Sequence, residues 1–194
     1  MPTPSKRQNR SSQALSLILV GMRGSGKTTV GRMLALKLDV PFVDTDDLVE
    51  ERAATSIEAI FRDQGESVFR TLEQEAIASL EKPHEILVVA TGGGAVLDPG
   101  NRRILAALGT VVFLDAPAQI LTRRIRGSQR PSLLKLNLDE EITVLLDRRR
   151  PLYMDLADFV LDATEPVDHI VAAITDIWLA DRTAVDRTRQ PKGT

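Results

Sequence analysis

The stretch Gly21-Met22-Arg23-Gly24-Ser25-Gly26-Lys27-Thr28 matches the pattern G-x-x-x-x-G-K-[ST] over its full length. A short apolar run at 17–20 precedes it, and a helix-length segment at 27–38 follows it. In this strand–loop–helix setting the pattern is typical of a loop that binds nucleotide phosphates. The sequence therefore predicts a nucleotide site here, although the loop alone does not separate a kinase from a GTPase or a motor ATPase.

Each residue type in this loop has a physical task. Glycines let the backbone turn tightly and bring its N–H groups against phosphate oxygens, while the next helix directs its positive N-terminus at the same point. Lys27 supplies a cation that reaches the β- and γ-phosphates of ATP, and the hydroxyl of Thr28 is placed to bind Mg²⁺. The candidate nucleotide-binding residues of the loop are Gly21, Gly24, Ser25, Gly26, Lys27, Thr28 and Thr29.

The composition excludes several classes of protein. Of the 194 residues, 43% are apolar and 27% are charged, which is ordinary for one soluble globular domain. A net charge of −2 provides no electrostatic reason to expect nucleic acid or a membrane as partner. The absence of cysteine excludes disulfides, thiolate zinc sites and cysteine nucleophiles, and it fits a cytoplasmic protein.

The two ends of the chain differ from its middle. Residues 1–14 are rich in Ser, Pro, Lys and Arg, and residues 181–194 are also polar. The apolar run at 17–20 is too short for a signal peptide or a membrane span. We therefore expect a disordered leader at 1–14, one domain at 15–180 and a disordered tail at 181–194.

Short β-branched apolar runs alternate with helix-length segments along the chain. Because parallel strands need crossover connections, this alternation predicts a doubly wound α/β fold, with five parallel strands and helices on both faces of the sheet. The expected strands are 17–20, 40–43, 86–90, 110–114 and 159–161. The expected helices are 27–38, 46–53, 56–63, 66–80, 101–108, 118–126, 140–157 and 167–179.

One segment, 126–139, shows no regular spacing of apolar residues and contains polar residues around Pro131. A connection of this length in a compact domain is usually a functional lid or a disordered excursion. Arginines at its start favour a mobile lid.

A cluster of carboxylates follows the second expected strand, in Asp44-Thr45-Asp46-Asp47. Open α/β sheets bind ligands at the carboxyl ends of their strands. Residues i and i+2 of an extended segment point the same way, so Asp44 and Asp46 can face one cleft, one toward a metal and one toward an acceptor hydroxyl. The alternative is that Asp46 or Asp47 caps the following helix.

Two further stretches can form an anion site. Arg70 precedes Glu73 by three residues in a mostly apolar helix, which fits either a bidentate carboxylate clamp or a surface ion pair. Gly92, Gly93 and Gly94 end the third expected strand, where they permit a ligand to approach backbone N–H groups or simply allow a flexible turn. Neither stretch decides between its alternatives by itself.

An ordered set of motifs runs along about residues 17–179, nearly the whole chain. The motifs are G-M-R-G-S-G-K-T-T, D-T-D, S-I-E-A-I-F, G-E-S-V-F-R-x-x-E, G-G-G-A-V, V-F-L, R-P and R-R-P-L-Y. In this order and spacing the chain resembles the shikimate kinase family. The resemblance implies a P-loop kinase fold with strand order 2-3-1-4-5, and a monomer that transfers the ATP γ-phosphoryl group to the 3-hydroxyl of shikimate with the help of Mg²⁺.

The resemblance also assigns roles to single residues. It implies that Asp44 serves the Mg²⁺ shell and that Asp46 contacts the shikimate hydroxyls as a base or orienting group. It implies that Arg70 and Arg149 clamp the shikimate carboxylate, with Glu73 holding Arg70. The further implied contacts are Gly92, Gly93 and Gly94 to shikimate, Arg130 to the transferring phosphoryl group, Arg123 or Arg124 to adenine, and Arg148 or Arg150 as possible substitutes for Arg149.

The chain departs from the family pattern at Pro131-Ser132, where R-P-L is usual; this changes the packing of the lid but keeps Arg130. Two rival interpretations are another small-metabolite kinase, such as a gluconate kinase, and a sensor domain that binds its effector without turnover. The pair Arg70 and Arg149 favours shikimate over gluconate as the acceptor. The intact phosphate-binding loop argues against the sensor.

Overall fold

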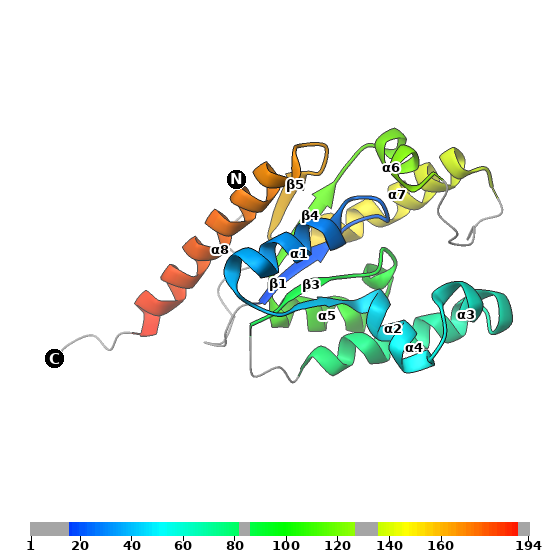
Figure 1. Cartoon of the computed structure of the whole chain (residues 1–194), viewed down its shortest axis with the longest axis horizontal. Coiled ribbons are helices and arrows are strands. Elements are labelled where there is room, and N and C mark those ends of the chain that lie inside the picture. The colour runs from blue at the N-terminus through cyan, green and yellow to red at the C-terminus, as the bar shows by residue number, and fades with distance from the viewer. Residues whose placement is uncertain (1–15, 82–85, 127–135, 190–194) are drawn as a thin grey trace.

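The computed structural model describes residues 16–81, 86–126 and 136–189. At its centre is a parallel sheet of five strands in the order β2-β3-β1-β4-β5 (Figure 1). The strands are β1 Ser16–Val20, β2 Phe42–Asp44, β3 Val88–Ala90, β4 Gly109–Asp115 and β5 Phe159–Asp162. The predicted fold class and strand order are confirmed.

Helices cover both faces of this sheet. The α-helices are α1 Lys27–Leu38, α2 Thr45–Ala53, α3 Ile57–Asp63, α4 Glu66–Ala78, α5 Pro99–Leu108, α6 Ala118–Ile125, α7 Leu138–Leu156 and α8 Val167–Arg189, and the 3-10 helices are η2 Ser79–Glu81 and η3 Ala95–Leu97. The step from β1 to β2 runs toward one edge of the sheet, and the steps from β3 to β4 to β5 run toward the other. Because crossover connections are right-handed, α1 lies on one face, beside α8, and α5 and α7 lie on the opposite face (Figure 1). None of the helices in the described ranges has the length and apolar character to cross a membrane.

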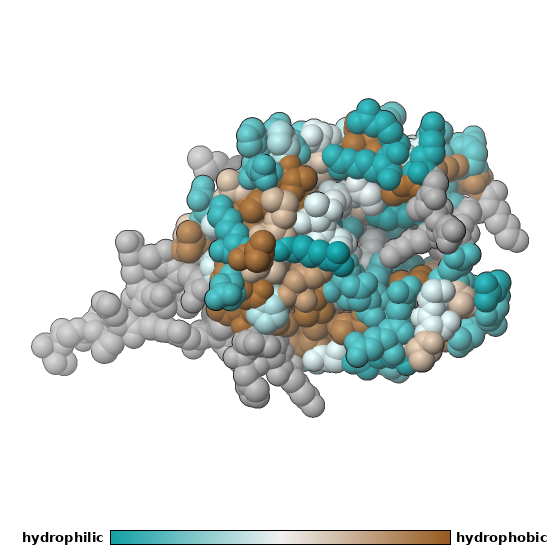
Figure 2. Space-filling view, viewed as in Figure 1, coloured by the Kyte–Doolittle hydropathy of each residue, from teal (hydrophilic) through white to brown (hydrophobic). Residues whose placement is uncertain are grey.

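The hydrophobic core has two parts. The larger part includes every residue of β1 except Ser16 and is built on the inner strands β1, β3 and β4. The smaller part joins α2, α3 and α4 and consists of Val49, Ile57, Ile60, Phe69 and Ala76. Figure 2 shows mostly hydrophilic residues on the visible surface of α2, α3 and α4, as expected for helices that turn their apolar sides inward. This second cluster stabilises the side of the molecule that carries Asp46 and Arg70.

Two element boundaries differ from the prediction in ways that matter. Strand β2 ends at Asp44 and helix α2 begins at Thr45, so Asp46 lies on a helix and not on an extended segment. The argument from i and i+2 spacing for Asp44 and Asp46 was therefore wrong, because the chain turns into the helix between them. Helix α8 continues to Arg189, whereas the prediction ended it at 179 and expected disorder from 181.

Several predicted features lie outside the described residues. These are the leader at 1–14, most of the predicted lid at 127–135 with Arg130, and the last part of the tail at 190–194. Their predicted disorder or mobility stays a prediction.

Gly109 gives a prediction for the stability of the sheet. It is opposite Ser16 in the pairing of β1 with β4, and an added Cβ would lie 1.9 Å from the Ser16 carbonyl oxygen. Backbone cannot move aside as a flexible side chain does, so Gly109→Ala is expected to lower the free energy of unfolding by about 1–3 kcal/mol. Chemical denaturation measures this loss, and an unchanged midpoint would contradict the close pairing of Ser16 with Gly109.

Candidate functional site

The phosphate-binding loop connects β1 to α1 and wraps around the side chain of Lys27. Nζ of Lys27 donates to the carbonyl oxygens of Gly21 and Met22, each at 2.9 Å. Gly24 and Gly26 take the backbone angles φ 81° and 93°, which side-chain-bearing residues rarely adopt. The loop therefore has the shape that its glycines predict, and Lys27 also helps to hold that shape.

A hydroxyl and a carboxylate meet beside the loop. Oγ1 of Thr28 donates to Oδ2 of Asp44 at 2.8 Å, and Oδ1 of Asp44 accepts from the backbone N–H of Asp46 at 3.0 Å. Asp44 is thus the N-cap of α2, and the alternative that Asp46 or Asp47 caps this helix is wrong. Burial is the largest cause that raises the pKa of Asp44, and the nearby carboxylates add to it, whereas the bond from Thr28 opposes it.

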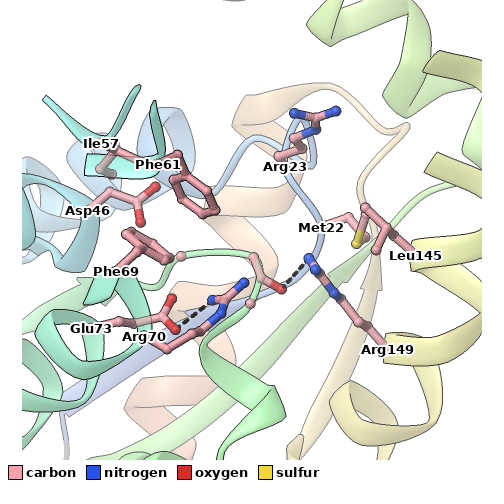
Figure 3. Close-up of a pocket in the computed structure, with 13 residues that line it drawn as sticks. Met22, Arg23, Asp46, Ile57, Phe61, Phe69, Arg70, Glu73, Leu145 and Arg149 are labelled. Atoms are coloured by element: carbon pink, nitrogen blue, oxygen red, sulfur yellow. Dashed lines mark hydrogen bonds and ion pairs between the residues drawn. The ribbon is translucent and has the colours of Figure 1, made fainter. Parts of the chain in front are cut away.

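An open pocket of about 540 Å³ lies between the phosphate loop, the α2–α4 side and α7 (Figure 3). In Figure 3, Asp46 and Glu73 lie on one side of it and Arg149 approaches from the other. The residues that line it are Met22, Arg23, Asp46, Ile57, Phe61, Phe69, Arg70, Glu73, Gly92, Gly93, Gly94, Leu145 and Arg149. The structure therefore brings all the residues predicted for the acceptor into one pocket that borders the phosphate loop.

Arg70 is held in the pocket wall by two carboxylates of its own helix. Its Nη1 lies 2.7 Å from Oε2 of Glu73, and its Nη2 lies 3.0 Å from Oε1 of Glu66. The Glu73 side chain is only 2% exposed, so the alternative of a simple surface pair is wrong. Burial raises the pKa of Glu73, and the charge of Arg70 opposes this shift. Oε1 of Glu73 is buried without a hydrogen-bond partner among the described residues.

The three successive glycines are needed for close packing. An added Cβ on Gly94 would lie 2.1 Å from Nη1 of Arg70, and one on Gly92 would lie 2.6 Å from Oδ1 of Asp46. Of the described glycines, those with positive φ lie elsewhere, at positions 21, 24, 26 and 65. Close approach of charged side chains, and not a flexible turn, therefore explains Gly92 and Gly94.

Arg149 reaches the pocket from α7. Its side chain is buried, and Nη1 donates to the Gly93 carbonyl at 3.3 Å, which also accepts from the hydroxyl of Tyr153. Burial is the largest cause that lowers the pKa of Arg149, and the positive charge of Arg70 acts in the same direction. Two guanidinium groups facing one pocket create a site for an anion.

The neighbours of Arg149 lie elsewhere. Arg148 is exposed, and Arg150 forms an ion pair with Asp115 at the end of β4. Because one turn of α-helix contains 3.6 residues, three consecutive arginines point in different directions. Of the three, Arg149 is the residue that lines the pocket.

The two candidates for adenine contact also differ. Arg124 donates to the carbonyl of Gly24 at 3.3 Å and to that of Ala163 at 2.9 Å, which places it against the phosphate loop. Arg123 is exposed. This geometry favours Arg124 as the residue near a bound nucleotide.

Sequence reasoning missed the apolar wall of the pocket, formed by Ile57, Phe61, Phe69 and Leu145. The helical period marks such residues as buried, but it does not say whether they face a core or a ligand. Phe61 and Phe69 come from different helices, and their ring centroids lie 4.8 Å apart. Arg70 lies over the ring of Phe69, with Cζ 5.0 Å from the ring centroid, and Leu145 and Arg149 both come from α7. Apolar side chains beside two arginines suit a compact ligand that has apolar surface and one anionic group.

Gly94→Ala tests the packing of Arg70. The added methyl group would occupy the position of the Arg70 guanidinium, so Arg70 must swing away from Glu73. We expect the variant to bind the acceptor at least about tenfold more weakly, which is the loss of one charge-assisted hydrogen bond, with little change in ADP affinity. Calorimetric titration of both ligands measures the two effects. Unchanged acceptor binding would contradict the position of Arg70 in this wall.

A protein-family model for shikimate kinase matches residues 23–178. The chain belongs to the shikimate kinase family. Shikimate kinase 2 of Sodalis glossinidius is 44% identical over 162 residues, which cover 81% of this chain and 92% of that protein. The shikimate kinase of Aromatoleum aromaticum is 46% identical over 148 residues, which cover 75% of this chain and 83% of that protein.

Solved structures agree with this membership of the shikimate kinase family. The shikimate kinase of Acinetobacter baumannii, solved in complex with shikimate, is 33% identical and has a TM-score of 0.81, over 87% of this chain and 96% of that one. A gluconokinase of Sinorhizobium meliloti is 15% identical with a TM-score of 0.56, over 91% of this chain and 98% of that one, a likeness of fold alone. As a member of this kinase family, the protein is an enzyme that uses ATP.

Proposed function

We propose that this protein transfers the γ-phosphoryl group of ATP to the 3-hydroxyl of shikimate and releases shikimate 3-phosphate and ADP. The observation that carries the proposal is the placement of Arg70 and Arg149 around one pocket beside the phosphate loop. Shikimate is a small ring with a single carboxylate, and this pocket offers two guanidinium groups beside apolar side chains. Membership of the shikimate kinase family supports the same substrate.

On the donor side, the proposal assigns ATP and Mg²⁺ to the phosphate loop and the residues beside it. The loop N–H groups and Lys27 would hold the phosphates of ATP, and Arg124 would lie near its base. Mg²⁺ in such sites is bound by few protein groups, with substrate phosphates and waters as the other ligands. The Thr28 hydroxyl and the Asp44 carboxylate, 2.8 Å apart, fit this pattern. The described residues contain no cluster of three or more side chains of His, Cys, Asp or Glu that could hold a metal by itself.

These two residues, Thr28 and Asp44, would therefore hold Mg²⁺. When bound, the ion would neutralise charge on the phosphate oxygens of ATP. Because Asp44 also caps α2, the same carboxylate fixes the helix that carries Asp46. The metal site and the acceptor pocket thus share one structural support.

On the acceptor side, Arg70 and Arg149 would bind the carboxylate of shikimate, with Glu73 keeping Arg70 in place. Asp46 would orient the reacting hydroxyl and accept its proton. The hydroxyl oxygen forms a bond to the γ-phosphorus as the bond from that phosphorus to the ADP oxygen breaks. Such transfers have a loose transition state, so positioning and charge neutralisation supply most of the catalysis.

Arg130 is proposed as a further cation at the transferring phosphoryl group, on the resemblance alone, because it lies outside the described residues. If it meets this group only in the transition state, Arg130→Ala should lower kcat by about 10²-fold or more while the Kd of shikimate hardly changes. Steady-state kinetics and calorimetric titration separate these two quantities. An intact kcat with greatly weakened shikimate binding would move Arg130 into the acceptor pocket.

One assay tests the function against its rivals. ADP release is measured in a coupled-enzyme assay with shikimate, with gluconate and without an acceptor. The proposal expects rapid release with shikimate only. Release with gluconate would indicate a different metabolite kinase, and tight shikimate binding without any release would indicate a sensor.

We also propose that the enzyme acts as a cytoplasmic monomer. The sequence without cysteine supports a reducing compartment, and the family resemblance supports the monomer. Light scattering on the purified protein tests the mass in solution, for which one chain is 21.3 kDa. A mass of twice this value would reject the monomer.

A further inference from the structure

An ion pair joins the phosphate loop to the first turn of α7. Nη2 of Arg23 lies 3.2 Å from Oε1 of Glu141, and the two residues are 118 positions apart in the chain. The side chain of Glu141 is 1% exposed and that of Arg23 is 17% exposed. Burying a carboxylate is strongly unfavourable unless a charge pairs with it. The contact therefore keeps these two elements together.

Arg23 lies where the phosphate loop meets the acceptor pocket. The carbonyl of its neighbour Met22 accepts from Lys27. On the other side, the backbone nitrogen of Arg23 would be 3.2 Å from a Cβ on Gly93, whose carbonyl accepts from Arg149. Figure 3 shows the Arg23 side chain at the upper edge of the pocket, on the loop. A shift of Arg23 would therefore change how the phosphate loop and the acceptor pocket lie relative to one another.

Helix α7 contacts both substrate sites through one face. Glu141, Leu145 and Arg149 follow one another at intervals of four residues, so they lie along the same side of the helix. All three are buried, and Leu145 and Arg149 line the acceptor pocket. Glu141 thus ties the phosphate loop to the same helix face that presents the acceptor clamp.

We propose that Arg23 and Glu141 form a positioning pair that sets the distance between the phosphate loop and the acceptor pocket; this inference rests on the proposed function. In-line transfer requires the attacking oxygen and the phosphorus to be close and aligned. A misplacement of about 1 Å can cost 10²-fold in rate without loss of binding. The pair prevents such a displacement, because it connects the loop that holds the donor to the helix that holds the acceptor.

Mutation of Arg23 and of Glu141 distinguishes a positioning pair from a direct catalytic contact of Arg23. If the guanidinium of Arg23 itself touched the phosphoryl group, removing Arg23 would cost much more than removing the charge of Glu141. For a positioning pair, loss of either member breaks the same contact. The two single variants should then lower kcat by similar factors, and these effects should not add in the double variant.

The experiment compares Arg23→Met, Glu141→Met and the double variant with the wild type, because methionine keeps the length of the side chain but cannot hydrogen-bond the guanidinium as a carboxylate does. Each single variant should lower kcat by about 10- to 100-fold. The kcat of the double variant should be no lower than that of the slower single variant. The Kd values of ADP and shikimate, measured separately, should stay within about threefold of the wild type. A purely structural role would instead change the Kd of ADP or of shikimate together with kcat.

Glu140→Met is the matched control. Glu140 lies in the same first turn and is exposed, so the variant removes an equal charge from the helix N-terminus without touching Arg23. The control should keep the wild-type kcat. If it lowered kcat as much as the variant at position 141, the charge at the helix N-terminus would explain the effect, and the proposed positioning pair would be wrong. An unchanged kcat in Glu141→Met, or reductions of kcat that multiply in the double variant, would also overturn the positioning pair. Absence of shikimate turnover in the wild type itself would instead overturn the proposed function, and this inference with it.

Discussion

Lys27→Ala is expected to lower the rate of phosphoryl transfer by at least about 10²–10³-fold, the usual loss for one preorganised electrostatic contact. The variant loses the cation that would meet the β- and γ-phosphates. It also loses two hydrogen bonds to the carbonyls of Gly21 and Met22, so the loop itself becomes less well held. The helices and the sheet do not depend on this side chain, so the circular dichroism spectrum should be unchanged.

Lys37→Ala serves as the control for this variant. Lys37 lies in the last turn of the same helix, α1, and is exposed. Removing it changes the net charge by the same amount, and turnover should stay at the wild-type level. Near-normal turnover of Lys27→Ala would mean that this loop is not where the phosphoryl transfer occurs.

Replacement of either acceptor arginine by lysine is expected to weaken shikimate binding by about 1.5–3 kcal/mol, the scale of a charge-assisted hydrogen bond. Lysine keeps the charge but loses the planar fork that binds a carboxylate through two N–H groups. The affinity for ADP should hardly change in Arg70→Lys and Arg149→Lys, because neither side chain contacts the phosphate loop in the described contacts.

Two controls make this result specific to the carboxylate. Arg148→Lys changes the exposed neighbour of Arg149 and should leave shikimate binding intact. An acceptor analogue with a neutral carboxamide should bind the wild type weakly and lose little more in either variant. Equal losses for shikimate and this analogue would show that the arginines support the fold and not the carboxylate.

The local part of the site was predictable from the sequence. The loop Gly21–Thr28 is a continuous segment whose glycines and flanking elements determine its conformation, so one stretch of chain contains all the information. The strand order and the pairing of Arg70 with Glu73 were also predictable. The first rests on family resemblance, and the second is an i, i+3 contact within one helix.

Contacts between distant segments were decided by the tertiary structure. The period of the helix cannot say which of Arg148, Arg149 and Arg150 faces the pocket; the packing of α7 against the sheet decides this. Likewise, the position of Asp46 depends on where β2 ends and α2 begins. That boundary follows from the cap formed by Asp44, a side-chain bond that a pattern of residue types does not specify.

The sequence by itself therefore determined the fold class, the phosphate loop and the helical pair that forms half of the acceptor clamp. Each of these depends on residues close together in the chain or on the periodic burial of apolar side chains. Only the tertiary structure decided the close approach of Gly94 to Arg70, the apolar wall of the pocket and the contact of Arg23 with Glu141. These contacts join segments that are far apart in the chain. The sequence of one segment does not indicate the other, because the distance between the two is set by how the helices pack on the sheet.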